Sequence, residues 1–196
     1  MPRKARSARA GALYHISHTC IQGTNAFRTP NDYKEFQLLL RDKQKEHAVT
    51  VPGLCLLPDG FHLLARPEDA GGLGRMMRDL LTTQVQRYRS RYGHQGALWH
   101  GRYRSVEVEQ GPAADQVLAL LRTLPVRRGL VTGEERWPWL RTEPSHSPAP
   151  NTERFVELCL RMPVPAGRPD WMLRAAADRL GSRPRGRPRR EAVAAN

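Results

Sequence analysis

Two periods of hydrophobic and polar positions organise the first part of the chain. Residues 13–17 alternate between apolar and polar side chains, which predicts a short strand with two different faces. A segment that starts at Pro30-Asn31-Asp32 then carries apolar residues at helical spacing, namely Tyr33, Phe36, Leu39 and Leu40. We therefore expect a strand followed by a helix that begins near residue 30.

A β-hairpin is predicted for residues 48–65. Residues 48–57 are mostly apolar, and Pro52-Gly53 within them predicts a bulge or an edge position, because proline cannot donate to a strand ladder. Pro58-Asp59-Gly60 is a strong turn signal, and residues 61–65 return as a second strand.

Three further elements complete the pattern. Residues 71–92 predict a long helix with one apolar side, formed by Leu73, Met76, Met77, Leu80, Leu81 and Val85. Residues 103–109 alternate again and predict a fourth strand, and residues 113–123 predict a final helix. This order is typical of an α+β fold with a ferredoxin-like split βαβ layer, in which helices cover one face of an antiparallel sheet.

Composition divides the chain into five parts. Residues 1–11 form a basic N-terminal arm, and residues 12–132 form the ferredoxin-like core. Residues 133–150 are a Pro-rich linker, residues 151–181 a helical arm, and residues 182–196 a basic tail that we expect to be disordered.

The charge of the chain indicates a polyanionic partner. The 196 residues include 32 Lys and Arg against 19 Asp and Glu, which gives a formal charge of +13 and a pI of about 10.7. This balance excludes an acidic disordered chain and argues against a typical metabolic enzyme.

No window approaches eighteen apolar residues, so no membrane span is predicted. The N-terminus lacks the apolar stretch of a signal peptide, and Cys20, Cys55 and Cys159 form neither a disulfide framework nor a zinc motif. We expect a cytoplasmic protein.

Six short sequence blocks follow one another in a recognisable order. They are Tyr14-His15-Ile16, Pro58-x-x-x-His62-Leu63-Leu64, Arg91-Tyr92-Gly93, Leu98-Trp99-x-Gly101-Arg102-Tyr103-x-Ser105, Pro125-Val126-Arg127-x-Gly129-Leu130-Val131 and Trp137-Pro138-Trp139. Over residues 10–140 the chain resembles the HUH single-tyrosine transposases, in particular the branch associated with repetitive extragenic palindromes (REP) in bacteria. The resemblance implies a core that recognises a DNA hairpin, a tyrosine that attacks the scissile phosphate, and a divalent metal held by two histidines and an Asn or Gln.

The positions that carry this chemistry differ in the present chain. The family strand motif Pro-Asn-His-apolar-His is Pro58-Asp59-Gly60-Phe61-His62 here, so Gly60 replaces the first histidine and His62 keeps the second. The family helix motif Tyr-x-x-x-Asn-Pro-Val-Arg aligns with residues 120–127. Leu120 therefore stands at the nucleophile's position and Leu124 at that of the third metal ligand. We expect a catalytically silent scaffold without a cofactor.

A rearranged active site is the alternative. Asp59 and His62, with His15 or His18, are weak candidates for a different Mg²⁺ or Mn²⁺ site; otherwise His62 packs as a neutral imidazole. The candidate replacement nucleophiles lie in basic surroundings but also match the family's ordinary scaffold pattern; they are Tyr88, Tyr92 and Tyr103.

Cations and aromatic residues interleave near the end of the long helix. Arginines position phosphates and aromatic rings stack on unpaired bases, so the candidate nucleic-acid-binding residues here are Arg87, Arg89, Arg91, Trp99, Arg102, Tyr103 and Arg104. Arg127 and Arg128 either begin a second basic site or cap the preceding helix. In the tail, Arg-Gly-Arg-Pro resembles an AT-hook core, with candidates Arg183, Arg185, Arg187, Arg189 and Arg190. A solvated helix end, core packing of the aromatic residues and a non-specific basic tail are the alternative interpretations.

Three functions are consistent with these features. The first is a catalytically inactive, transposase-derived protein that recognises hairpin, palindromic or single-stranded DNA and acts by occupancy at the bacterial nucleoid. The second is an active transposase or nickase with a rearranged metal and tyrosine site, and the third is an RNA-hairpin-binding module. The sequence leaves open whether the chain is a monomer or a homodimer.

Overall fold

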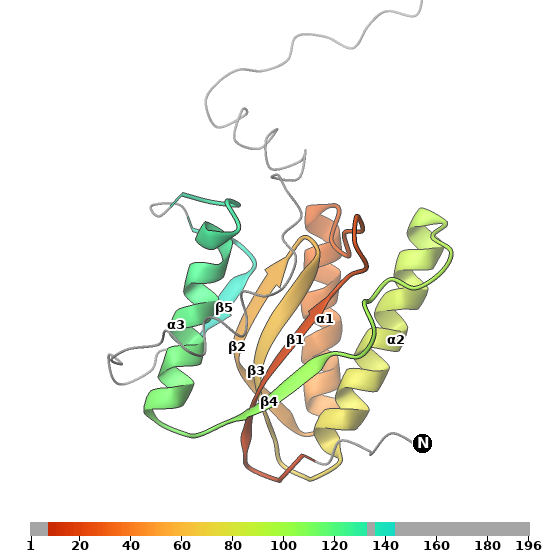
Figure 1. Ribbon diagram of the computed structural model, residues 1–196. Coiled ribbons are helices and arrows are strands. Elements are labelled where there is room, and N and C mark those ends of the chain that lie inside the picture. Colours follow the sequence, from red (N-terminus) through yellow and green to blue (C-terminus); the bar gives the residue numbers. More distant parts are fainter. Residues whose placement is uncertain (1–7, 133–135, 144–196) are drawn as a thin grey trace, which may run out of the picture.

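The computed structural model describes residues 8–132 and 136–143, which form a five-stranded sheet with three helices (Figure 1). The elements in chain order are β1 (Leu13–Thr19), α1 (Pro30–Glu46), β2 (Val49–Leu57), β3 (Gly60–Pro67), α2 (Gly72–Tyr92), β4 (Arg104–Val108), α3 (Pro112–Arg127) and β5 (Leu140–Thr142). The expected α+β fold with its split βαβ layer is confirmed.

The sheet is antiparallel, in the order β4-β1-β3-β2-β5. The β2–β3 hairpin closes at Leu57 and Gly60, as the Pro-Asp-Gly turn predicts. Its register shifts between Thr50 and Gly53, which confirms the bulge expected at Pro52-Gly53. Central strands β1, β2 and β3 are buried along nearly their whole length, so both faces of the sheet are covered.

Helices cover the two faces of the sheet unequally. Helices α1 and α2 pack against each other on one face, where Phe36 of α1 contacts Phe61 of β3. Helix α3 lies on the opposite face, because Leu118 and Leu121 occupy the space beside Gly53, whose neighbour across the hairpin is Leu64. The expectation of helices on one face therefore holds for α1 and α2 and is corrected for α3 (Figure 1). Helical periodicity identifies an apolar side but not which face of a sheet receives it.

Capping motifs mark the beginning of α1 and the end of α2. Thr29 and Asp32 form a reciprocal capping box at the start of α1, and Gly93 ends α2 with a φ of 62°. Helix α3 continues to Arg127, four residues beyond the predicted end at Thr123. Its interior Pro125 stands in the last turn, where the chain closes through hydrogen bonds from Arg128, Gly129 and Leu130.

The core continues past the predicted boundary at residue 132. Trp139 is buried and stacks on Tyr33 of α1 at 4.7 Å between ring centroids, and the Trp137 indole donates to the Leu56 carbonyl at 2.6 Å. Residues 136–143 thus belong to the core rather than to a linker, and β5 adds an edge strand that alternation over three residues does not reveal.

The basic arm and the C-terminal segments are described only in part. Of the predicted arm at residues 1–11, residues 8–11 are described, and Arg9 forms an ion pair with Glu107 of β4. The predicted helical arm at 151–181 and the tail at 182–196 lie outside the described residues.

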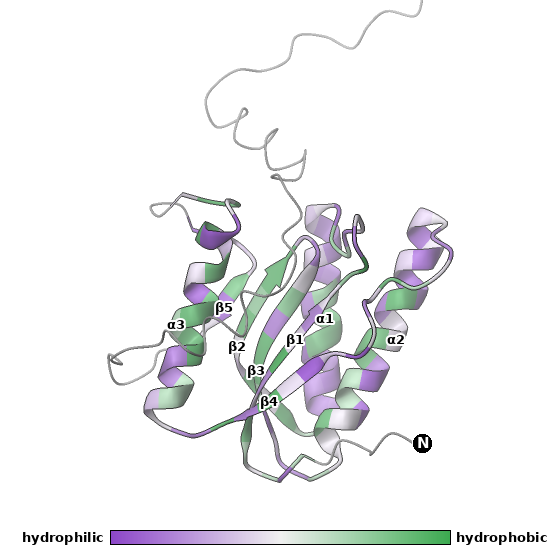
Figure 2. Ribbon diagram, in the orientation of Figure 1, coloured by the Kyte–Doolittle hydropathy of each residue, from purple (hydrophilic) through white to green (hydrophobic). Residues whose placement is uncertain are grey.

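Figure 2 shows hydrophobic residues concentrated on β2 and β3, whereas the helices carry both hydrophobic and hydrophilic residues. No helix in the described part of the chain is long and apolar enough to cross a membrane.

Candidate functional site

The layer between the sheet and α3 contains the positions that the transposase resemblance assigns to catalysis. Side chains alternate along a strand, so His62 lies on the same face of β3 as Leu64, the face that α3 covers. His15 pairs with Leu64 across β1 and β3 and shares this face. Leu120 and Leu124 are buried in α3.

His15 and His62 form a buried hydrogen-bonded pair. Nε2 of His15 lies 3.1 Å from Nδ1 of His62, and the two rings stack at 5.3 Å between centroids. Burial lowers the pKa of His15 to about 4. Burial, then the His15 and Arg128 charges, lower the pKa of His62 well below its usual value. Both imidazoles are therefore neutral at pH 7, and one ring donates its N–H to the other.

Gly60 leaves no room for a side chain. A Cβ built at this position would lie 2.2 Å from the backbone carbonyl oxygen of His18 and 3.1 Å from the Thr19 Cα. Both atoms belong to the backbone of the neighbouring strand β1, which cannot swing away as a flexible side chain can. A histidine at position 60 would therefore require the β1–β3 pairing to shift.

Asp59 and Arg128 form an inward-facing ion pair. Nη1 of Arg128 lies 3.3 Å from Oδ2 of Asp59, and the two side chains are 11% and 8% exposed. Burial raises the pKa of Asp59, and the Arg128 charge opposes that rise. Arg128, a predicted phosphate contact, is thus committed to a buried carboxylate, whereas Arg127 is exposed.

The residues at the catalytic positions do not fit the divalent metal that the transposase resemblance implies. Gly60 has no side chain that could ligate a metal, and the side chains of Leu120 and Leu124 are hydrocarbon. His62 is hydrogen-bonded to His15. Asp59 is bonded to Arg128, and His18 belongs to the other face of the sheet, where it stacks on Trp99 at 4.7 Å. Among residues 8–132 and 136–143, one group of three potential metal ligands converges, and it lies elsewhere, at Glu46, His47 and Asp79.

The three candidate replacement tyrosines lie away from His62. Tyr88 and Tyr92 belong to α2 on the opposite face of the sheet, and Tyr103 contacts His18 on that side. Burial raises the pKa of Tyr88. Burial and the hydrogen bond to Asp32, at 2.7 Å, raise the pKa of Tyr92. A raised pKa disfavours the phenolate, which is the nucleophilic form.

The predicted cluster of arginines and aromatic residues separates into structural and exposed members. Arg91 forms ion pairs with Asp32 and Glu35 of α1 at 2.6 Å each, and Arg89 donates a hydrogen bond to the Gly96 carbonyl at 2.8 Å. Trp99 is buried against His18 and does not present a free stacking face. Three exposed arginines have no ion-pair partner among the described residues: Arg87, Arg102 and Arg104.

Comparison with solved structures relates this architecture to a known fold. No protein-family model matches the sequence, and no curated protein matches it either. The chain is similar to the REP-associated tyrosine transposase bound to a REP hairpin, with 14% identity and a TM-score of 0.58 over 71% of this chain and 82% of that one. A protein of Deinococcus radiodurans assigned as a transposase is 20% identical over 58% of this chain and 92% of that one, with a TM-score of 0.42. This chain has the fold of a REP-associated tyrosine transposase.

Within this transposase fold, an arginine-rimmed pocket that no sequence pattern predicts lies between α3 and β5. The pocket has a volume of about 540 Å³, and Arg122, Arg136 and Arg141 line it. The remaining lining residues are apolar or neutral: Pro125, Val126, Val131, Trp137, Leu140 and Thr142. The three arginines are 14 and 5 residues apart along the chain, so a local search for basic runs does not connect them. The unpredicted strand β5 brings them together.

Proposed function

We propose that this chain is a transposase-derived DNA-binding protein that does not cleave DNA and acts by occupying its target. The proposal rests on the residues at the three positions that the family resemblance assigns to catalysis. Leu120 and Leu124 are buried in apolar packing, and the β1 backbone fills the space that a side chain at Gly60 would need. Neither a phenol nor a set of metal ligands is available there to activate a phosphodiester.

Charge and fold together support DNA as the partner. The chain carries a formal charge of +13, and the solved transposase with the same fold was captured with a REP hairpin. We infer that this chain binds hairpin, palindromic or single-stranded DNA through its exposed arginines. Arg87, Arg102 and Arg104 would contact phosphates on one side, and the α3–β5 pocket would contact them on another.

A panel of fluorescent nucleic acids tests the proposal. A DNA hairpin with flanking single strands, a linear duplex of the same composition and a matched RNA hairpin are titrated with the full chain in the presence of Mn²⁺. We expect preferential binding of the DNA hairpin and no denaturation-resistant protein–DNA adduct. A Mn²⁺-dependent adduct abolished by substitution of Tyr88, Tyr92 or Tyr103 would establish a rearranged active site, and preference for the RNA hairpin would make the chain an RNA-binding module.

Charge-matched variants locate the interface. The double variants Arg102→Ala/Arg104→Ala and Arg122→Ala/Arg141→Ala are compared with the control Arg41→Ala/Arg66→Ala, which removes two exposed arginines elsewhere on the surface. If a pair contacts phosphates, its loss lowers the slope of log K against log salt by about two, and the control changes the slope less. Equal losses in all three variants would indicate non-specific attraction without a defined interface.

A further inference from the structure

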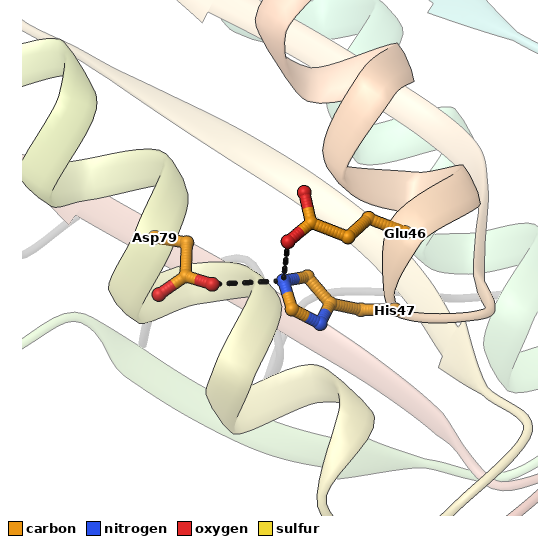
Figure 3. A group of neighbouring side chains, drawn as sticks. All are labelled: Glu46, His47 and Asp79. Carbon is orange, nitrogen blue, oxygen red and sulfur yellow. Dashed lines mark hydrogen bonds and ion pairs between the residues drawn. The ribbon is translucent and has the colours of Figure 1, made fainter.

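Three potential metal ligands converge where α1 ends beside α2 (Figure 3). Glu46 is the last residue of α1, His47 caps the helix, and Asp79 projects from α2. Nε2 of His47 lies 2.9 Å from Oδ2 of Asp79 and 3.6 Å from Oε1 of Glu46. All three atoms lie within 4.8 Å of one another.

Two carboxylates face a single imidazole nitrogen. One N–H can satisfy only one of them, and the distance to Asp79 is a hydrogen bond whereas the distance to Glu46 is not. The second oxygen of each carboxylate is held by a cation, Lys43 at 2.6 Å for Glu46 and Arg78 at 2.9 Å for Asp79. These outer contacts orient the inner oxygens toward the imidazole, as secondary contacts orient the ligands of metal sites.

The location of the group independently favours a cation. The C-terminal end of a helix carries partial negative charge, and this group sits at the end of the 17-residue helix α1. The His47 amide bonds the Lys43 carbonyl at 3.1 Å, which fixes the residue in its capping position. The Glu46 side chain is 52% exposed, so water can reach the group from one side.

We propose that His47, Asp79 and Glu46 bind a zinc ion, with water as the fourth ligand. Imidazole nitrogen and carboxylate oxygens are zinc ligands, and tetrahedral bonds of about 2.0 Å place ligand atoms about 3.3 Å apart, close to the separations found here. In the zinc-bound form, Nε2 of His47 offers its lone pair to the ion and Nδ1 carries the proton of the neutral ring. The ion links the end of α1 to α2 on the sheet face opposite His62, so it is independent of the positions discussed under the proposed function.

Thermal unfolding of the untagged full chain, freed of metal and then titrated with ZnCl₂, tests the site. Zinc at a hundred times its dissociation constant is expected to raise the melting temperature by about 5 to 10 °C. The variants His47→Gln and Asp79→Asn are expected to lose this zinc-induced shift. Comparing shifts rather than melting temperatures removes the effect of the ion pair that each variant also breaks. The matched controls His94→Gln and Asp42→Asn, which lie outside the group, are expected to keep it.

Cobalt spectroscopy provides a second measurement. Co²⁺ is expected to give visible absorption bands of a four-coordinate site in the wild type and in both controls, displaced by Zn²⁺ and absent from the two site variants. An equal zinc-induced shift in the site variants and the wild type would overturn the proposal. So would the absence of saturable binding, since the group would then be an ion-pair cluster only.

Discussion

His15 and His62 are two polar residues buried between β-strands and helix α3, where hydrophobic residues are usual. Each imidazole is a polar group in an apolar layer, and each satisfies the other through the 3.1 Å contact. A buried polar pair is stable only while both members stay neutral, because burying a charge costs far more than burying a neutral ring. The pair therefore ties the stability of the protein to pH.

We expect stability to fall as the pH drops from 6.5 toward 4. Burial lowers the pKa of His15 from 6.5 in the unfolded chain to about 4 in the folded one, so in this range the unfolded chain binds a proton that the folded chain excludes. Each pH unit then removes about 1.4 kcal/mol per histidine, and the contribution is fully present above pH 6.5. Urea unfolding at pH 7.5, 6.0, 5.0 and 4.5 measures the slope. His15→Gln should flatten it and His100→Gln, at an exposed histidine, should not; parallel profiles for all three proteins would contradict the prediction.

Gly60 provides a second prediction for a single residue. Gly60→Ala should lower the free energy of unfolding by about 1 to 3 kcal/mol, because the added Cβ meets the β1 backbone. Gly74→Ala is the matched control, since a Cβ in that exposed helical position meets nothing within 4 Å and should stabilise the protein by about 0.5 kcal/mol. Denaturant midpoints measure both. Equal midpoints would mean that β1 yields easily and that position 60 can hold a ligand after all.

At the scale of elements, one carboxylate joins the beginning of α1 to the end of α2. Oδ2 of Asp32 accepts hydrogen bonds from the Arg28 and Thr29 amides and from the Tyr92 hydroxyl, and Oδ1 pairs with Arg91. Burial raises the pKa of Asp32, but these hydrogen bonds outweigh that effect and lower it below its usual value. Arg91 and Tyr92 thus connect the end of α2 to the beginning of α1.

Asp32→Asn should destabilise the protein by about 2 kcal/mol at pH 7. It weakens the capping box of Thr29 and removes the negative charge beside Arg91, while Glu35 still accepts from that arginine. The loss should shrink as the pH falls through the folded-state pKa of Asp32, where the wild type is protonated as well. The loss should begin to shrink below pH 3.8, the value in the unfolded chain, so chemical unfolding at pH 7 and at about pH 2.5 tests this, with Asp42→Asn on the exposed side of α1 as control. A loss of the same size at both pH values would argue against the ionised carboxylate as its source.

At the scale of the whole molecule, positive charge is the dominant feature outside the core. Counterion release makes the affinity of a protein for DNA fall linearly in log K against log salt, with a slope of about −0.9 per neutralised phosphate. Under the proposed function, the exposed arginines on two sides of the fold would provide several such contacts.

Affinity for the DNA hairpin should therefore fall at least tenfold between about 50 and 200 mM salt. Fluorescence anisotropy at four salt concentrations measures the slope, and a neutral osmolyte at matched osmolality controls for general solvent effects. An affinity that stays flat across this range would contradict a phosphate-based interface.

Local sequence signals determined the elements of this protein except β5. The strands at 13–17 and 61–65, the helix opened by Pro30 and the turn at Pro58-Asp59-Gly60 all follow from side-chain periodicity and backbone preferences, which act over a few residues. The positions that the family resemblance assigns to catalysis could also be located in the sequence, because the flanking motif residues mark where they stand.

Only the tertiary structure decided which side chains meet. The sheet register places His15 diagonally opposite His62, 47 residues away, on the same face of the sheet, and β5 brings Arg141 beside Arg122. It also turns Arg128 inward to Asp59, whereas the pattern of charges predicted an outward role. The physical reason is that periodicity defines the faces of an element, whereas its partners depend on the packing of layers from distant parts of the chain.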